Sequence, residues 1–278
     1  MNSINIKDKY YQEEKCGISK LYEEVKKGIE LNEFRFVYQP KFNIRTNNIF
    51  GVEILIRWHK SNGEIVQPNE FISRLEEEKL IYLIDYYAIE ECMIKISEWS
   101  VNNSINIVPI AVNLSKSTFM REDFLERLNC LIEKYKISLK HLEFEITERE
   151  ALEFNIEDIN RRIEEIKMLG IKISVDDFGS GNSNISFSLD VDLDIIKIDK
   201  SMIDRIGKNK KIEYILAAIM NLARDNNIEL IAEGIETEEQ NKFLIDNGYS
   251  FGQGYYFSKP IELSELEEKY LVKCICKN

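Results

Sequence analysis

The sequence predicts an α/β fold, and within that class a TIM-like (β/α)8 barrel. Short apolar runs rich in β-branched residues alternate with stretches whose apolar residues recur at helical spacing. The length of 278 residues suits such a barrel, which typically takes about 250 residues. Several β-rich runs also end in a polar residue. A doubly wound open sheet is the alternative, but many polar strand ends favour a closed barrel, because closure brings the carboxyl ends of its strands to one mouth.

The expected elements begin with a helix over 18–31, indicated by apolar residues on one face: Ile18, Leu21, Tyr22, Val25 and Ile29. Two strands are expected at 34–38 and 49–58, and Pro68 then opens a helical stretch that reaches to about residue 99. Further along, strands are expected at 107–113, 142–147, 171–176, 194–198, 228–232 and 249–256. Helices are expected between them near 117–135, 156–169, 209–226 and 237–247.

Composition indicates one large domain over 18–278, preceded at 1–17 by a polar N-terminal tail or linker stub. The formal net charge of −12 argues against nucleic-acid polymers and anionic membranes as partners, since both attract a basic surface. We see no signal peptide and no apolar run near the ~20 residues that span a bilayer, so we expect no membrane segment in this chain. Five scattered cysteines are typical of reduced thiols, and a cytoplasmic location is therefore expected.

The adjacent carboxylates Asp176 and Asp177 are the most informative feature for function. They close the β-branched run 171–175 and precede a Gly-Ser-Gly sequence. The alternation of side chains relaxes where a strand ends, so both carboxylates can turn toward one site. Two such close charges repel each other unless a cation lies between them, which suggests a metal and even two metals that share one carboxylate. The alternative is that this pair only caps a helix or a turn.

Other β-rich runs carry polar residues at or near their ends, namely Glu53, Asn113, Glu145, Glu148, Lys197, Asp199, Glu233 and Gln253. So many strand-end groups are hard to explain as solvated loops. The chain has only two histidines, which argues against a histidine-rich zinc site and favours oxygen ligands. Oxygen ligands in turn favour Mg²⁺ or Mn²⁺.

These residues resemble the EAL domain family, the cyclic di-GMP phosphodiesterases. The resemblance runs from about Leu21 to Pro260. Its signature tripeptide reads Glu53-Ile54-Leu55, preceded by Tyr38-Gln39-Pro40 and followed in order by Asn113-Leu-Ser115, Glu145-Ile-Thr-Glu148, Asp176-Asp-Phe-Gly179, Lys197-Ile-Asp199, Ala232-Glu-Gly-Ile-Glu236 and Gln253-Gly-Tyr255. Each motif is weak alone, whereas their occurrence together and in this order is specific.

The resemblance implies a TIM-like barrel with one antiparallel strand, and two divalent cations, Mg²⁺ or Mn²⁺. By resemblance the first cation is held by Glu53, Asn113, Glu145 and Asp176, and the second by Asp176, Asp177 and Glu233. Catalytic roles fall to Glu53, Lys197, Glu233 and Gln253, with Lys197 and Gln253 near the attacking water. Substrate binding falls to Gln39, Arg57, Asp199 and Gln253. Asp199 has an equally supported alternative as a strand-end residue that pairs with Lys197 or Lys200.

The resemblance also implies that Glu148 and Glu236 steady the loop from Gly179 to Phe187, and that the chain forms a homodimer and responds to an upstream sensor domain or partner protein. The implied reaction is metal-dependent hydrolysis of cyclic di-GMP to linear pGpG, which lowers a bacterial second messenger. Lys197 could act as general base only if the metals depress its pKa.

Two departures from the family pattern matter. Ile54 replaces alanine in the signature, and it should pack against the barrel helices because it faces away from Glu53. The segment Ser180–Asn184 replaces a Thr-Gly-Tyr-Ser-Ser sequence, so the aromatic residue is lost at Asn182. This change keeps open a second function, a receptor that binds cyclic di-GMP without cleaving it. A phosphodiesterase for another nucleotide is a third.

Overall fold

The computed structural model describes residues 19–147, 155–180 and 191–273. Its strands are β1 (Phe34–Asn43), β2 (Asn48–His59), β3 (Ile65–Val66), β4 (Ile110–Asn113), β5 (Leu142–Thr147), β6 (Lys172–Phe178), β7 (Ile195–Ile198), β8 (Glu229–Ala232) and β9 (Phe251–Gly252). Its helices are α2 (Lys20–Glu30), α3 (Pro68–Glu77), α4 (Tyr82–Val101), α5 (Lys116–Phe119), α6 (Phe124–Tyr135), η1 (Leu139–His141), α8 (Ile156–Met168), α10 (Lys200–Ile203), α11 (Lys210–Asp225), α12 (Glu238–Asp246), α13 (Leu263–Leu266) and η2 (Glu267–Leu271).

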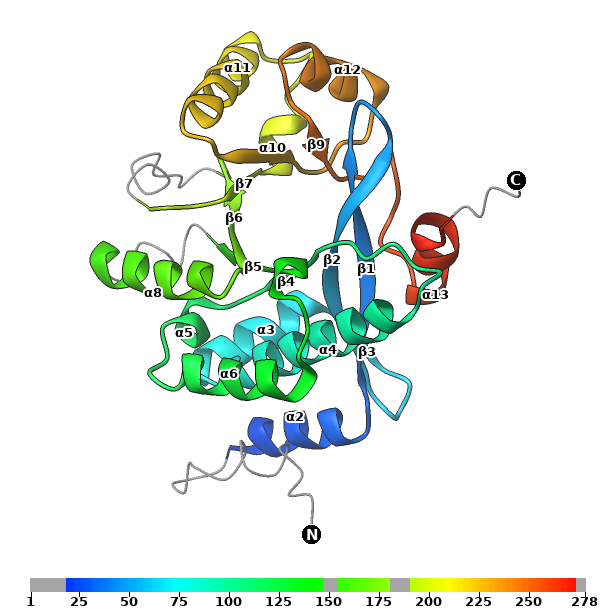
Figure 1. Ribbon diagram of the computed structural model, residues 1–278, viewed down its shortest axis with the longest axis vertical. Coiled ribbons are helices and arrows are strands. Elements are labelled where there is room, and N and C mark those ends of the chain that lie inside the picture. The colour runs from blue at the N-terminus through cyan, green and yellow to red at the C-terminus, as the bar shows by residue number, and fades with distance from the viewer. Residues whose placement is uncertain (1–18, 148–154, 181–190, 274–278) are drawn as a thin grey trace.

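Eight strands close into a barrel surrounded by helices (Figure 1). The order is β1-β9-β8-β7-β6-β5-β4-β2, and pairing between β1 and β2 completes the ring, while β3 pairs outside it with β2. Within the ring, β1 runs antiparallel to both of its neighbours and the other pairs are parallel. The predicted TIM-like barrel with one antiparallel strand is therefore confirmed.

Local sequence signals explain where several helices begin. Ser19, Asn155 and Asn209 each accept a backbone hydrogen bond at the start of α2, α8 and α11. Helix α12 opens with a capping box, in which Thr237 and Gln240 satisfy each other's backbone N–H groups. Helix α2 precedes the first barrel strand, whereas α8, α11 and α12 come after β5, β7 and β8, so their caps help to set the connections at the barrel rim.

Several elements differ from the sequence expectation. The helical stretch from Pro68 divides into α3 and α4 because Lys79 takes a left-handed conformation (φ 56°) that ends α3. The helix expected near 117–135 is likewise two helices, α5 and α6. The last strand is confined to Phe251–Gly252, because the chain then turns and the Gln253 carbonyl accepts a hydrogen bond from Ile235 N–H.

Alternation along the strands separates an apolar outer layer from a polar barrel interior. Val52 and Ile54 are buried in the main apolar cluster with Ala88 and Ile89 of α4, whereas Glu53 between them faces the interior. Ile54 thus packs in the helix-covered layer, as expected. A second apolar cluster joins α2, α3 and the start of α4 to the N-terminal end of β1 and the C-terminal end of β2. Within the described parts of the chain, no helix has both the length and the apolar character needed to cross a membrane.

Candidate active site

A bulge in β6 brings the two adjacent aspartates to one site. Pairing with β7 aligns Val175 with Ile196 and Phe178 with Ile198, so β6 holds one extra residue over this stretch. Asp177 takes a left-handed conformation (φ 61°), which aspartate tolerates better than most residues. The strand therefore turns both Asp176 and Asp177 toward the same side, and the Asp177 N–H donates to Asp176 Oδ1 at 2.9 Å.

Lys197 lies at the centre of a cluster of carboxylates from four different strands or strand ends. Its Nζ is 2.7 Å from Glu145 Oε2, 2.9 Å from Glu233 Oε1, 3.2 Å from Glu53 Oε2 and 3.3 Å from Asp176 Oδ1. The Lys197 side chain is fully buried. The closed barrel thus brings together five residues that are far apart in the sequence.

Two amide side chains complete the cluster. Asn113 Nδ2 donates to Glu53 Oε1 at 2.9 Å, which leaves the amide oxygen of Asn113 available as a ligand. Gln253 Nε2 donates to both Glu53 Oε2 (2.9 Å) and Glu233 Oε1 (2.8 Å). Gln253 Oε1 is buried and accepts no hydrogen bond from the described residues. A water or substrate group that donates a hydrogen bond would satisfy this oxygen.

The carboxylates form two groups that share Asp176. Oxygen atoms of Glu53, Glu145 and Asp176 all lie within 4.8 Å of one another, and the same is true of Asp176, Asp177 and Glu233. One carboxylate that belongs to both groups can bridge two cations. This is the geometry that the aspartate pair suggested from the sequence.

The electrostatics of the cluster are strongly perturbed. Burial alone would raise the pKa of Glu53, but Lys197, Lys41 and two amide hydrogen bonds lower it to about 2. Burial and the neighbouring Glu53 charge raise the pKa of Glu145 to about 8. Burial also raises the pKa of Glu233 well above its usual range. Although burial opposes its charge, Lys197 keeps a raised pKa because Asp176 and the other carboxylates surround it.

The donor set fits two hard divalent cations. The two groups contain five carboxylates, and the Lys197 ammonium balances only one of them. When all five are ionised, four negative charges remain, which two divalent cations would balance. The available ligand atoms are carboxylate and amide oxygens, the type that Mg²⁺ and Mn²⁺ prefer.

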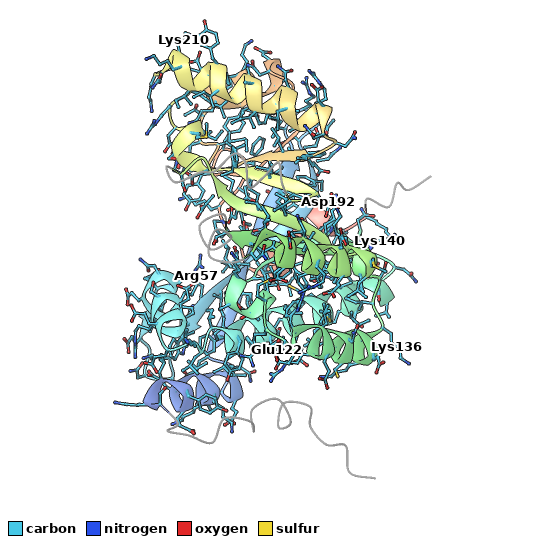
Figure 2. The ribbon with its side chains drawn as sticks, turned by 90° about the vertical axis from the view of Figure 1, so that its left-hand side faces the viewer. Arg57, Glu122, Lys136, Lys140, Asp192 and Lys210 are labelled. Atoms are coloured by element: carbon cyan, nitrogen blue, oxygen red, sulfur yellow. The ribbon has the colours of Figure 1, made fainter. Side chains whose placement is uncertain are left out.

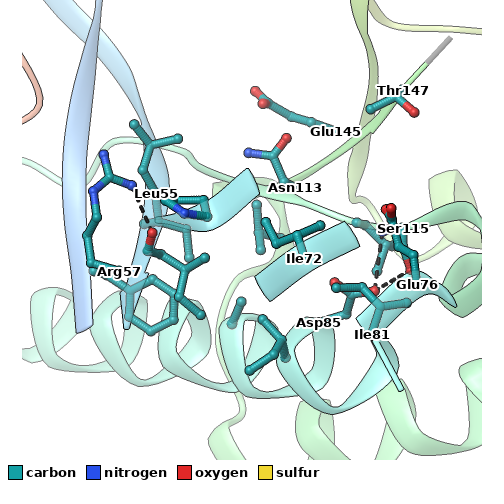
Figure 3. Close-up of a pocket in the computed structure, with 18 residues that line it drawn as sticks. Leu55, Arg57, Ile72, Glu76, Ile81, Asp85, Asn113, Ser115, Glu145 and Thr147 are labelled. Atoms are coloured by element: carbon teal, nitrogen blue, oxygen red, sulfur yellow. Dashed lines mark hydrogen bonds between the residues drawn. The ribbon is translucent and has the colours of Figure 1, made fainter. Parts of the chain in front are cut away.

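A cavity of about 300 Å³ extends from the cluster toward α3 and α4. Asn113, Glu145 and Thr147 line one part of it, and apolar side chains line much of the rest (Figure 3). Arg57 of β2 also lines this cavity (Figure 3), and its Nη1 donates to the Ile56 carbonyl at 2.8 Å. A partly exposed guanidinium next to an apolar cavity can bind a phosphate whose base enters the cavity.

The remaining predicted residues lie around this centre. Gln39 pairs in register with Glu53 and donates from Nε2 to the Ser258 carbonyl at 3.0 Å. Asp199 caps α10 and accepts the Ser201 N–H at 2.9 Å, so its predicted contact with substrate stays a prediction. The alternative was an ion pair between Asp199 and Lys197 or Lys200. Both lysines have other partners, since Lys197 contacts the carboxylate cluster and Lys200 pairs with Asp204 and Glu236.

The predicted support for the loop after the aspartate pair remains a prediction. Glu148 lies outside the described residues, as do 181–190, which include Asn182. Glu236 forms an ion pair with Lys200 at 2.7 Å. At the described start of the loop, Gly179 adopts φ 94° and a side chain there would overlap Met202. Glycine is therefore required at this position, just after Phe178 ends the strand.

Comparison with known proteins identifies the family. The EAL domain family model matches residues 22–260. This chain belongs to the EAL domain family. It is 35% identical over 242 residues to the oxygen sensor protein DosP of Escherichia coli (strain K12). The matched region covers 87% of this chain and 30% of that protein. The family predicted from the sequence motifs is thereby confirmed.

Two further relatives of this EAL domain carry an activity in their names. The probable cyclic di-GMP phosphodiesterase PdeD of Escherichia coli (strain K12) is 33% identical over 246 residues, covering 87% of this chain and 44% of that protein. The cyclic di-GMP phosphodiesterase PA2567 of Pseudomonas aeruginosa is 31% identical over 237 residues, covering 84% of this chain and 40% of that protein. The chain thus spans less than half the length of these relatives.

Solved structures share the fold. The EAL enzyme Bd1971, solved with cAMP and cyclic di-GMP bound, superposes with a TM-score of 0.81 at 29% identity, covering 90% of this chain and 68% of that one. The PaMucR phosphodiesterase in complex with cyclic di-GMP gives a TM-score of 0.80 at 27% identity, covering 89% of this chain and all of that one. PaMucR is thus a phosphodiesterase by name, which is the enzyme class expected for this chain from its sequence.

Two residues of the EAL domain that our sequence reasoning missed lie beneath the cluster. Lys41 Nζ is 2.6 Å from Glu145 Oε1 and 3.1 Å from Glu143 Oε1, and both ion pairs are buried. Neither Lys41 nor Glu143 lies at the carboxyl end of its strand. The available signal was that Glu143 and Glu145 are two residues apart on one strand, so they share a face.

Proposed function

We propose that this chain is a metal-dependent phosphodiesterase that hydrolyses cyclic di-GMP to linear pGpG and so lowers a bacterial second messenger. The observation that carries the proposal is the pair of carboxylate groups that share Asp176. The names of its relatives support the substrate and the reaction.

Two cations, Mg²⁺ or Mn²⁺, would be held by different sides of the cluster. The first would be held by Glu53, Asn113, Glu145 and Asp176, and the second by Asp176, Asp177 and Glu233. Such a pair of cations, when bound, neutralises phosphodiester charge, activates water and supports the leaving oxygen. Asp176 would fix the spacing of the pair, because its carboxylate belongs to both groups.

The chain's own residues would position the other reactants. Lys197 would donate a hydrogen bond to the attacking water and stabilise the negative charge that develops in the transition state. Its ammonium is in the right place for this, because it lies among four carboxylates of the proposed metal site. Gln253 Oε1, which lacks a partner among the described residues, would accept a hydrogen bond from the same water. Arg57 would bind a substrate phosphate while apolar side chains of the neighbouring cavity cover a base.

The deciding experiment is turnover of cyclic di-GMP by the purified chain with Mg²⁺ or Mn²⁺, resolved by chromatography. Glu53→Gln removes one ligand charge with little change in shape, and Glu122→Gln makes the same change at an exposed surface position (Figure 2). We expect metal-dependent pGpG formation by the parent and by Glu122→Gln, and its loss in Glu53→Gln. Equal turnover by all three proteins would refute the site.

The same assay separates the second candidate function. Binding of cyclic di-GMP by the parent without formation of pGpG would assign the chain to the receptor class. The expected homodimer, the upstream sensor domain or partner, and the cytoplasmic location stay predictions, to be measured by light scattering, pull-down and fractionation of cells.

A further inference from the structure

Lys41 is a buried lysine that the proposed reaction does not use. Its side chain is 1% exposed, and its Nζ lies between Glu143 Oε1 (3.1 Å) and Glu145 Oε1 (2.6 Å). A buried ammonium without partners would be strongly unfavourable, so its position in the structure depends on these two acids. Of the two, Glu145 belongs to the proposed metal site and Glu143 lies one step deeper on β5.

The antiparallel strand β1 explains how Lys41 reaches this position. Gln39 pairs with Glu53 and Lys41 pairs with Gly51, so Lys41 lies one step below Gln39 on the same interior face. A Cβ on Gly51 would lie 3.7 Å from Lys41 Cδ and 3.3 Å from the Pro109 carbonyl oxygen. The lysine stem therefore runs alongside Gly51 inside the barrel, at ordinary contact distance.

The two ammonium groups divide the Glu145 carboxylate between them. Lys41 contacts Oε1, whereas Lys197 contacts Oε2 at 2.7 Å from the side of the carboxylate cluster. Oε1 is therefore occupied by its contact with Lys41 in the barrel interior, and Oε2 is the oxygen on the side of the carboxylate cluster. We infer that Lys41 is a positioning residue, which fixes Glu145 so that it offers one oxygen, Oε2, to the first cation.

This inference rests on the proposed metal site and adds a residue to it. Removal of a residue that hydrogen-bonds to a metal ligand and orients it typically lowers metal affinity about 10–100-fold. Glu143 has a different role from Glu145, because it contacts Lys41 but belongs to neither of the two carboxylate groups. Its charge offsets that of Lys41, which allows the two to be removed together without leaving an unbalanced buried charge.

The test measures Mn²⁺ affinity by titration calorimetry on three proteins: the parent, Glu143→Gln, and the double variant Lys41→Met with Glu143→Gln. Glu143→Gln is the matched control, since it keeps the contact between Lys41 and Glu145. We expect its Mn²⁺ affinity to stay within about threefold of the parent, and that of the double variant to fall about 10–100-fold. Thermal unfolding without metal is measured alongside, because a purely structural role would lower the melting temperature and leave the affinity of the folded protein unchanged.

Each other outcome is decisive. Parent-like Mn²⁺ affinity in the double variant would overturn the role of Lys41 and leave the metal site standing. A loss in Glu143→Gln as large as that in the double variant would overturn it too. Should the double variant fail to unfold cooperatively, and a second one with Lys41→Gln fail likewise, Lys41 would be a folding residue and the inference would be wrong. Failure of the parent to bind Mn²⁺ would instead refute the proposed metal site.

Discussion

Lys197→Met should make the stability of the EAL domain depend on divalent cations far more than it does in the parent. The lysine is fully buried, and four carboxylates lie within 3.3 Å of its Nζ. Methionine keeps much of the side-chain volume and removes the charge. The carboxylates are then left buried without that ammonium, and cations become the principal means of balancing them.

The magnitude follows from the burial of the cluster. Removing one partner from a buried ion pair costs about 3–5 kcal/mol of unfolding free energy. We expect the low end, about 3 kcal/mol, because Glu145 and Glu233 already have raised pKa values and can take up protons. For a domain of this size that corresponds to a fall of about 6–12 °C in melting temperature. Bound Mn²⁺ should restore most of it, because the freed carboxylates bind the cation more tightly.

The assay is thermal unfolding of parent and variant, with and without Mn²⁺. Lys242→Met is the matched control, since Lys242 forms an exposed ion pair with Asp246 at 3.2 Å, whose loss should have little effect with or without metal. The difference in melting temperature between parent and Lys197→Met should shrink in Mn²⁺. An equal difference under both conditions would refute the view that the lysine and the cations compensate the same charges.

Three further predictions concern single positions. Asp177→Asn should lower Mn²⁺ stoichiometry from two to one per chain in calorimetry, and two full sites in this variant would contradict the assignment. Arg57→Ala should raise KM for cyclic di-GMP about tenfold or more, the value of one hydrogen bond to a charged group, with Mn²⁺ affinity unchanged; an unchanged KM would exclude a phosphate contact. Gly254→Ala would overlap the Ile235 backbone, so it should reduce stability by more than about 2 kcal/mol and slow turnover by displacing Gln253, and a parent-like melting temperature would contradict this.

Convergence of the strand-end residues could be predicted from the sequence because it depends on one physical rule. Parallel strands that alternate with helices place their carboxyl ends on one side of a barrel. Glu145, Asp176, Lys197 and Glu233 obey that rule, since each lies at or near the end of a strand that is parallel to its neighbour. That both aspartates turn toward one site was predicted as well, but the bulge in β6 that turns them was not, because the strand was expected to end at Asp176 and instead continues to Phe178.

Lys41 could not be predicted in this way. It lies within a strand that runs antiparallel to both neighbours, so the strand-end rule does not apply to it. In the sequence, a lysine in an amphipathic strand is typical of a solvent-exposed face. Only closure of β1 against β9 and β2 shows that this face is enclosed. The helix break at Lys79 was missed for a related reason, because lysine carries no local signal for a left-handed conformation.

The order of charges through the barrel explains why cations should bind at its mouth and not deeper. From the interior outward, Glu143, Lys41, Glu145 and Lys197 alternate in sign and each contacts the next at 3.1 Å or less. The deep end is therefore balanced by lysine. Beyond Lys197 the acids outnumber the ammonium groups, because Glu53, Asp176 and Glu233 all face that one lysine. Among these described residues, negative charge is in excess on the outer side of Lys197, next to the cavity that Asn113 and Glu145 line, and it is there that cations and an anionic substrate can be held together.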